Sequence, residues 1–247
     1  MKRRTLGQHY LIDGEVVNTI IGDAAIKPRE RILEIGTGRG VLTKQLVRLG
    51  ASLEGYEVDG ENFTATLAEL GPEKAVIHHG DAFKENPDFD VLVSSLPYSR
   101  SASFVEWISR VRYNRAVVLL QDDFVAKMMS KPGTREYRAV SVIAQTSSEL
   151  TVLGRVGRSS FSPAPNVESI ILLVKPKRRL KDSEVSVIKR IFSLRRREVA
   201  SVGATFGMSL TAERYGKRRV YSLTPSEVLE ICGLYAETCN QTWRNMS

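Results

Sequence analysis

The sequence contains few cysteines and no long hydrophobic run. Its 247 residues include two cysteines, Cys232 and Cys239, and three histidines that lie far from both of them. Two cysteines indicate no disulfide framework and fit a reducing cytoplasm, and so few sulfur and imidazole ligands predict no metal site. No apolar stretch approaches the roughly 20 residues of a membrane-spanning helix. We therefore expect a cytoplasmic protein with no membrane segment.

Positive charge is concentrated in one late segment of the chain. The net charge is +8. Residues 175–219 hold 14 Lys/Arg and 4 Asp/Glu, a balance of +10, whereas the remainder holds 22 basic and 24 acidic residues, a balance of −2. A charge run is often only a solvated surface. An asymmetry this strong favours a polyanion partner, and nucleic acid is the first candidate.

Short apolar runs alternate with helical patterns over the first two-thirds of the chain. Such alternation predicts an α/β fold with a parallel sheet that is covered by helices on both faces. Ligands then bind outside the carboxyl ends of the strands. Strands are expected at residues 31–35, 53–58, 75–78, 91–94, 116–120, 150–156 and 167–174, with helices at 41–49, 61–70, 101–111 and 122–129.

The pattern changes after Pro176, where helical periodicity and basic residues dominate. Helices are expected at residues 185–192, 195–202 and 225–234. We therefore predict two domains, one of residues 1–176 and a small helical one of residues 177–247.

A glycine-rich loop, Glu34-Ile35-Gly36-Thr37-Gly38-Arg39-Gly40, follows the first predicted strand. Glycines let a backbone turn sharply and approach a ligand closely. The motif alone is weak evidence, because it serves a dinucleotide, S-adenosylmethionine (SAM) or merely a turn. The dinucleotide pattern is G-x-G-x-x-G, and here the third glycine comes one residue early. The shorter spacing suits a ligand that has no pyrophosphate.

Two acidic residues follow the next two strands. Glu57 lies about 20 residues after the glycines, where a carboxylate accepts hydrogen bonds from ribose hydroxyls. Asp81, after the third strand, is placed to accept one from an adenine amine. Each acid alone is more often a helix N-cap or a solvated turn residue. Together, at one edge of the sheet, they predict a nucleoside pocket.

The segment Ser95-Leu96-Pro97-Tyr98 ends the fourth predicted strand. Proline donates no ladder hydrogen bond and holds the preceding residue extended, so the chain leaves the sheet here. Unpaired carbonyls beside an aromatic ring suit a planar amine. An ordinary strand-ending turn is the alternative for the tetrapeptide taken alone.

These motifs, in this order, resemble the small-subunit rRNA adenine dimethyltransferases of the KsgA type. Other segments add to the resemblance, and the longest of them is Phe161-Ser162-Pro163-Ala164-Pro165-Asn166-Val167-Glu168-Ser169. The rest are Gly7 to Leu11, Lys131-Pro132-Gly133 with Tyr137, Ser141 to Gln145, and Arg195-Arg196-Arg197, which is similar to the basic helix that opens the C-terminal domain of that family.

The resemblance implies a class I SAM-dependent methyltransferase. Its seven-stranded sheet ends in an antiparallel hairpin and is followed by a helical domain that binds rRNA. The implied substrate is adenosine in the rRNA of an immature small subunit, and the implied enzyme is a monomer that needs no metal. Implied cofactor-binding residues are Gln8, His9, Leu11, Gly36, Gly38, Glu57, Val58, Asp81, Ala82 and Ser95. Implied catalytic residues are Ser95, Leu96, Pro97, Tyr98 and Phe161.

The chain departs from the family at two places. Ser95 replaces an Asn that accepts a hydrogen bond from the target amine, and His9-Tyr10 replaces Asn-Phe. A serine hydroxyl is also an acceptor, but it reaches on the order of 1 Å less far. Normal dimethylation, slow or single methylation, and RNA binding without catalysis are therefore all open. We expect an active enzyme. The alternatives are a weakly active or inactive ribosome-assembly factor, or an adenine methyltransferase that acts on large-subunit rRNA or DNA.

Overall fold

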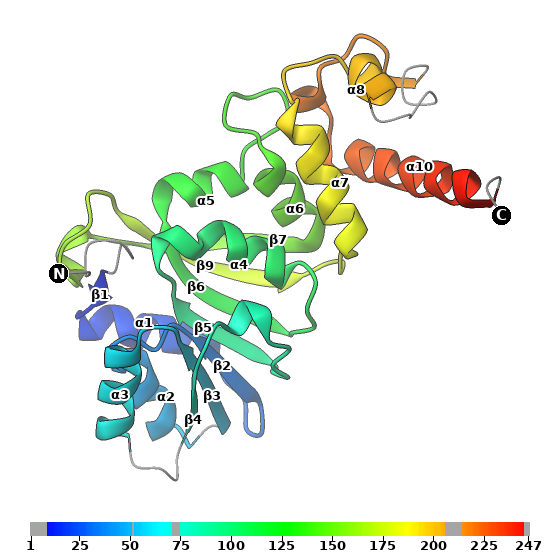
Figure 1. The fold of residues 1–247 in the computed structure, drawn as a ribbon. Helices are drawn as coiled ribbons and strands as arrows, with labels where there is room; N and C mark the ends of the chain where they lie inside the picture. Colours follow the sequence, from blue (N-terminus) through cyan, green and yellow to red (C-terminus); the bar gives the residue numbers. More distant parts are fainter. Residues whose placement is uncertain (1–8, 51, 71–74, 206–213, 245–247) are drawn as a thin grey trace. The chain divides into compact units, whose positions relative to one another are not determined.

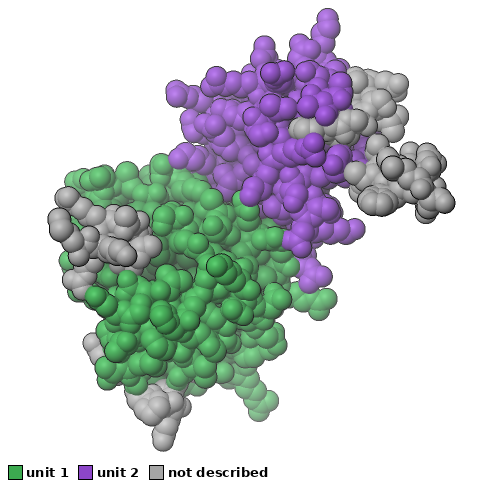
Figure 2. Space-filling view, in the orientation of Figure 1, with its two compact units in different colours: residues 1–125, 148–176 green, residues 126–147, 177–247 purple. Residues whose placement is uncertain are grey.

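The computed structural model describes residues 9–50, 52–70, 75–205 and 214–244, and it divides into two compact units (Figures 1 and 2). The first unit comprises residues 1–125 and 148–176, and the second comprises residues 126–147 and 177–247. One division between the units falls after Pro176, where the sequence predicts a domain boundary. The segment 126–147, in contrast, belongs to the second unit and not to the first.

Seven strands form the sheet of the first unit, in the order β4-β3-β2-β5-β6-β9-β7. The first five run parallel, and β9 is antiparallel to both of its neighbours. The antiparallel pair of β7 and β9 confirms the expected closing hairpin. The strands are β2 (Arg31–Ile35), β3 (Ser52–Glu57), β4 (Val76–His79), β5 (Val91–Ser95), β6 (Arg115–Gln121), β7 (Ser148–Val156) and β9 (Ser169–Pro176).

Apolar side chains fill both faces of this sheet. Val91 and Val93 of β5 belong to one core cluster, while Leu92 between them is equally buried and points to the opposite face because strand side chains alternate. The cluster includes side chains of α1 and α2. A parallel sheet buried on both faces fits its near-continuous apolar strands. The helices of this unit are α1 (Gly14–Ala24), α2 (Val41–Arg48), α3 (Gly60–Glu69) and α4 (Ser101–Ile108); α5 (Asp122–Met128) spans the division.

A two-stranded ribbon attaches the N-terminal segment to the rest of the first unit. Strand β1 (Tyr10–Leu11) pairs antiparallel with β8 (Phe161–Ser162), so that Leu11 lies opposite Phe161. Both side chains are buried in the core cluster, with Phe161 only 4% exposed. Helix α1 then begins at its N-cap Asp13, whose Oδ1 accepts hydrogen bonds from the amides of Glu15 and Val16.

The second unit contains α6 (Ala139–Ser147), α7 (Asp182–Ser193), α8 (Val199–Thr205) and α10 (Pro225–Arg244). Helix α6 packs against α7 and α10, and the rings of the buried Tyr137 and Phe192 pack edge to face with their centroids 5.6 Å apart. These contacts explain why residues 126–147 belong to this unit. No helix in the described ranges is long and apolar enough to cross a membrane.

The segment 195–197 is not helical, contrary to the expectation of a helix over 195–202. Arg195 and Arg196 lie in a turn after α7, and Arg197 forms a bend before α8. The amide of Arg197 donates to the carbonyl of Leu194, and Glu198 forms a β-bridge with Arg219. Because Glu198 takes part in this bridge, it is not helical, and α8 begins only at Val199.

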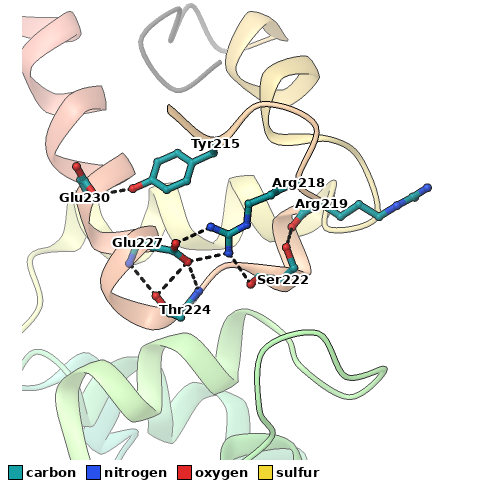
Figure 3. A network of polar contacts seen from close by, with 7 residues as sticks. All are labelled: Tyr215, Arg218, Arg219, Ser222, Thr224, Glu227 and Glu230. Atoms are coloured by element: carbon teal, nitrogen blue, oxygen red, sulfur yellow. Dashed lines mark hydrogen bonds and ion pairs between the residues drawn. The ribbon is translucent and has the colours of Figure 1, made fainter. Parts of the chain in front are cut away.

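A polar network fixes the start of α10 (Figure 3). Thr224 and Glu227 form a reciprocal cap, in which Glu227 Oε2 accepts from the amide of Thr224 and Thr224 Oγ1 accepts from the amide of Glu227. Arg218 donates to both carboxylate oxygens of Glu227, at 2.6 and 3.0 Å. The hydrogen bond from Arg218 lowers the pKa of Glu227 to about 2.

Candidate active site

A cavity lies at the carboxyl ends of β2, β3, β4 and β5. Its wall is built from the loop after each of these strands and from the N-terminal ribbon. Most of the residues expected to bind a cofactor or substrate line it: His9, Leu11, Gly36, Gly38, Glu57, Val58, Asp81, Ala82, Ser95, Leu96 and Pro97. Gln8 lies outside the described residues. Tyr98 and Phe161 are not part of the wall.

Glu57 joins the glycine loop to the end of β3. Its Oε2 accepts from the amide of Gly38 at 2.8 Å, and its Oε1 accepts from the amide of Asp59 at 2.9 Å. Gly38 has φ +56°, which a side chain rarely adopts, so a glycine is needed at this turn. Each carboxylate oxygen retains further acceptor capacity. The arrangement holds Glu57 rigidly while leaving it able to accept two hydroxyl hydrogen bonds.

Glu34 is a buried carboxyl group in the same cavity. It is 1% exposed, and its Oε2 has no hydrogen-bond partner among the described residues. Burial, together with the negative charge of Glu57, raises the pKa of Glu34 to about 8. Glu34 is therefore largely protonated at neutral pH, and a cation in the cavity would favour its ionised form.

Glu34 should make the stability of the protein depend on pH. Between pH 4.5 and 8 the unfolded chain loses the Glu34 proton while the folded chain keeps it, so the free energy of unfolding falls as the pH rises through this window. Glu34→Gln removes the ionisable group and should reduce the loss between pH 5 and pH 9 by about 4 kcal/mol. Urea unfolding at pH 5 and at pH 9 measures this loss of unfolding free energy. Glu149→Gln, at an exposed residue, is the control. Equal losses in the Glu34→Gln variant and the wild type would contradict this assignment.

The segment Ser95–Tyr98 leaves the sheet as its proline predicts. Ser95 is the last residue of β5, and neither its hydroxyl nor the carbonyl of Leu96 has a hydrogen-bond partner among the described residues. Pro97 lies against the glycine loop, since a Cβ placed on Gly36 would be 3.5 Å from Pro97 Cδ. Two residues with unpaired acceptors therefore line the same cavity as the glycine loop and directly precede Pro97, which contacts that loop.

Two aromatic residues differ from expectation in their surroundings. The Tyr98 hydroxyl forms a 2.7 Å hydrogen bond with Ser169 Oγ. The half-buried ring of Tyr98 lies beside that of His9, with the two ring centroids 5.4 Å apart. Phe161 is enclosed in the hydrophobic core, so no face of its ring is open to a base. The structure gives Phe161 a packing role and leaves Tyr98 beside the cavity.

Sequence reasoning missed several residues of the wall. Tyr10 donates to Asn62 Oδ1 at 3.2 Å, and the guanidinium of Arg39 lies 4.6 Å from the Tyr10 ring centroid. Asp81 is paired with Arg100. None of these contacts belongs to a local motif, and the partners come from different loops. Two positions signal proximity to the site: that of Tyr10, between His9 and Leu11, and that of Arg39, within the glycine loop.

The wall fits SAM. Glu57 offers acceptors to ribose hydroxyls, the glycine backbone permits close approach, and the unpartnered carboxyl oxygen of Glu34 suits a cationic ligand. A mostly parallel seven-stranded sheet with an antiparallel end and this pocket define a class I SAM-dependent methyltransferase. The chain belongs to the ribosomal RNA adenine dimethylase family, which it matches over residues 1–226.

Similar proteins come from archaea, bacteria and a eukaryote. A probable ribosomal RNA small subunit methyltransferase A of Thermococcus gammatolerans is 31% identical over 242 residues, which cover 92% of this chain and 87% of the relative. Ribosomal RNA small subunit methyltransferase A of Thermotoga neapolitana is also 31% identical, over 94% of this chain and 91% of that one. The crystal structure of a dimethyladenosine transferase from Plasmodium falciparum superposes with a TM-score of 0.78 at 23% identity, covering 94% of this chain and 98% of that chain. This last match supports the fold.

Proposed function

We propose that this protein transfers methyl groups from SAM to the exocyclic amine of adenosines in small-subunit rRNA. The pair of unpartnered acceptors at Ser95 and Leu96, in the same cavity wall as the glycine loop, carries the proposal. The names of the relatives, which are small-subunit rRNA methyltransferases, support the choice of substrate. Glu57 and Asp81 in the cavity argue against a purely structural assembly factor, which would not require a cofactor pocket.

The adenine amine is a poor nucleophile because its lone pair is delocalised into the ring. The Ser95 hydroxyl and the Leu96 carbonyl would accept its two hydrogens and draw the nitrogen toward a tetrahedral geometry. When bound, SAM supplies a methyl group on a positively charged sulfur. The contribution of this chain is positioning together with preorganised dipoles. Tyr98 would stack on the extruded base. Its ring would either move away from His9 or stay against His9 while it stacks on the base.

The second unit supplies a surface that suits RNA phosphates. Arg138 lies with Arg195, Arg196 and Arg197 around one groove. Burial, and then the charges of Arg138 and Arg196, lower the pKa of Arg195, as expected where guanidinium groups crowd together. A bound polyanion would stabilise such a cluster by neutralising its positive charges. The rRNA-binding domain of the proposal is therefore the second unit, which includes residues 126–147 in addition to residues 177–247.

The remaining parts of the proposal concern the assembly. We infer that the protein acts as a monomer, in the cytoplasm, on an immature small subunit. A large substrate that carries its own RNA scaffold gives no reason for a second copy of the enzyme.

Transfer of radiolabelled methyl from SAM tests the substrate. Small- and large-subunit RNA, each as deproteinised RNA and as ribosomal particles from cells that lack the modification, and a DNA that contains adenine are offered separately to the enzyme. We expect label in small-subunit RNA, at least tenfold above that in large-subunit RNA. Label found only in large-subunit RNA, or only in DNA, would replace the proposed substrate while leaving the SAM site intact.

A further inference from the structure

An arginine is paired with the acidic residue that follows β4 in the wall of the cavity. Arg100 Nη2 donates to both carboxylate oxygens of Asp81, at 2.7 Å to Oδ1 and 2.6 Å to Oδ2. Asp81 follows β4, whereas Arg100 ends the short helical turn Tyr98–Arg100 that follows β5. Both residues line the cavity. The pair therefore joins the loop of the proposed target base to the loop of the cofactor.

The pairing leaves Asp81 with few free acceptor positions. Oδ1 accepts from the amide of Phe83 at 3.1 Å in addition to Arg100, while Oδ2 accepts only from Arg100 among the described residues. A carboxylate oxygen accepts about two hydrogen bonds. One position on Oδ2 is consequently left for a ligand, and Arg100 determines which oxygen that is and how it is oriented.

Arg100 is itself held in place. Its guanidinium lies over the ring of Phe83, 4.8 Å from the centroid, and Phe83 contacts the buried Trp107. The side chain of Arg100 is 37% exposed and that of Asp81 is 21% exposed. A surface pair at such exposure would contribute little to stability. The bracing by an aromatic ring and the position in the cavity wall point to a role in the site.

We propose that Arg100 is a positioning residue for the adenine end of the cofactor. It orients the Asp81 carboxylate so that Oδ2 accepts a hydrogen bond from an exocyclic amine, and it thereby sets the preference of the pocket for an amino group over a carbonyl oxygen. The inference rests on the proposed function, because it takes the cavity to be the SAM site.

Calorimetric titration with two product analogues tests this role without any methyl transfer. S-adenosylhomocysteine carries the amine, and S-inosylhomocysteine carries a carbonyl oxygen in its place. The wild type should bind the amine form at least about tenfold more tightly, since a site built around a hydrogen bond rejects a ligand that cannot make it. Arg100→Met keeps the apolar stem over Phe83 and should reduce this ratio to about threefold or less. Arg100→Lys should restore part of it.

Two further variants separate positioning from a general structural effect. In an Asp81→Asn background, Arg100→Met should have no additional effect on the ratio, because Arg100 acts through that carboxylate. Arg48→Met, on the exposed end of α2 and outside the cavity wall, should leave the ratio unchanged. A wild-type ratio in Arg100→Met, or an equal loss of affinity for both analogues, overturns the role of Arg100. A wild type that binds neither analogue overturns the proposed SAM site as well.

Discussion

Glu57→Ala is expected to lower the affinity for SAM by at least about a hundredfold. The carboxylate is 4% exposed and holds the amides of Gly38 and Asp59, so its removal costs the ribose acceptors and loosens the glycine loop. Hydrogen bonds to a charged group contribute roughly 1.5–3 kcal/mol each, and two of them exceed the 2.8 kcal/mol that corresponds to about a hundredfold. Calorimetric titration with SAM measures the change.

Two variants control this experiment. Glu57→Gln keeps the size of the side chain but places an amide N–H₂ against backbone donors, and its affinity should fall between those of the wild type and the alanine variant. Glu54→Ala changes an acid of the same strand that is not part of the cavity wall, and it should bind SAM like the wild type. Wild-type affinity in Glu57→Ala would show that the cofactor binds elsewhere.

Ser95→Ala is expected to reduce kcat by about 10²–10³-fold, with the Kd for SAM unchanged within about twofold. The substitution removes one of two preorganised acceptors for the target amine, and losing one such group typically has an effect of this size. The hydroxyl has no other hydrogen-bond partner among the described residues, so the fold loses little. Single-turnover methylation of small-subunit RNA, together with titration of SAM, separates the two quantities.

Ser95→Asn is the matched variant for the same position. It supplies an acceptor with on the order of 1 Å more reach, so it should keep activity and raise the fraction of adenosines that receive a second methyl group. A Ser95→Ala variant with wild-type kcat would remove Ser95 from the mechanism and leave the Leu96 carbonyl as the only proposed acceptor.

Local sequence patterns predict the central sheet, and most of the predicted site residues line one cavity. Each predicted parallel strand is found within one or two residues of its expected place, because a strand buried on both faces is marked by its own apolar run. The glycine loop, Glu57, Asp81 and Ser95 meet in one cavity because parallel strands end at the same edge. The spacing of apolar residues and the common direction of the parallel strands are enough to predict this part of the fold.

Contacts between distant segments account for what the sequence does not reveal. Strands β1 and β8 have two residues each, too few for a periodic signal, and they pair across 150 residues. The aromatic character of Phe161 indicates equally a ring in the core or a ring on a base, and only packing distinguishes them. The pair of Asp81 and Arg100 likewise depends on two loops that converge after folding.

The assignment of residues 126–147 shows the same limit. The segment precedes β7 in the chain, and the sequence predicts a helix only at its start, over residues 122–129. Its helix α6 instead packs against α7 and α10, and the buried Tyr137 contacts Phe192 of α7. A composition change at Pro176 marks where the chain finally leaves the sheet, but it does not reveal that residues 126–147 already belong to the second unit.

The nucleoside content of treated RNA shows directly whether this protein methylates adenosine in small-subunit rRNA. The purified enzyme is incubated with SAM and small ribosomal subunits that lack the modification, and the rRNA is digested to nucleosides and analysed by mass spectrometry. We expect N6,N6-dimethyladenosine, absent when SAM is omitted and formed at least about a hundredfold more slowly with Ser95→Ala. No methylated adenosine in the presence of bound SAM would contradict it.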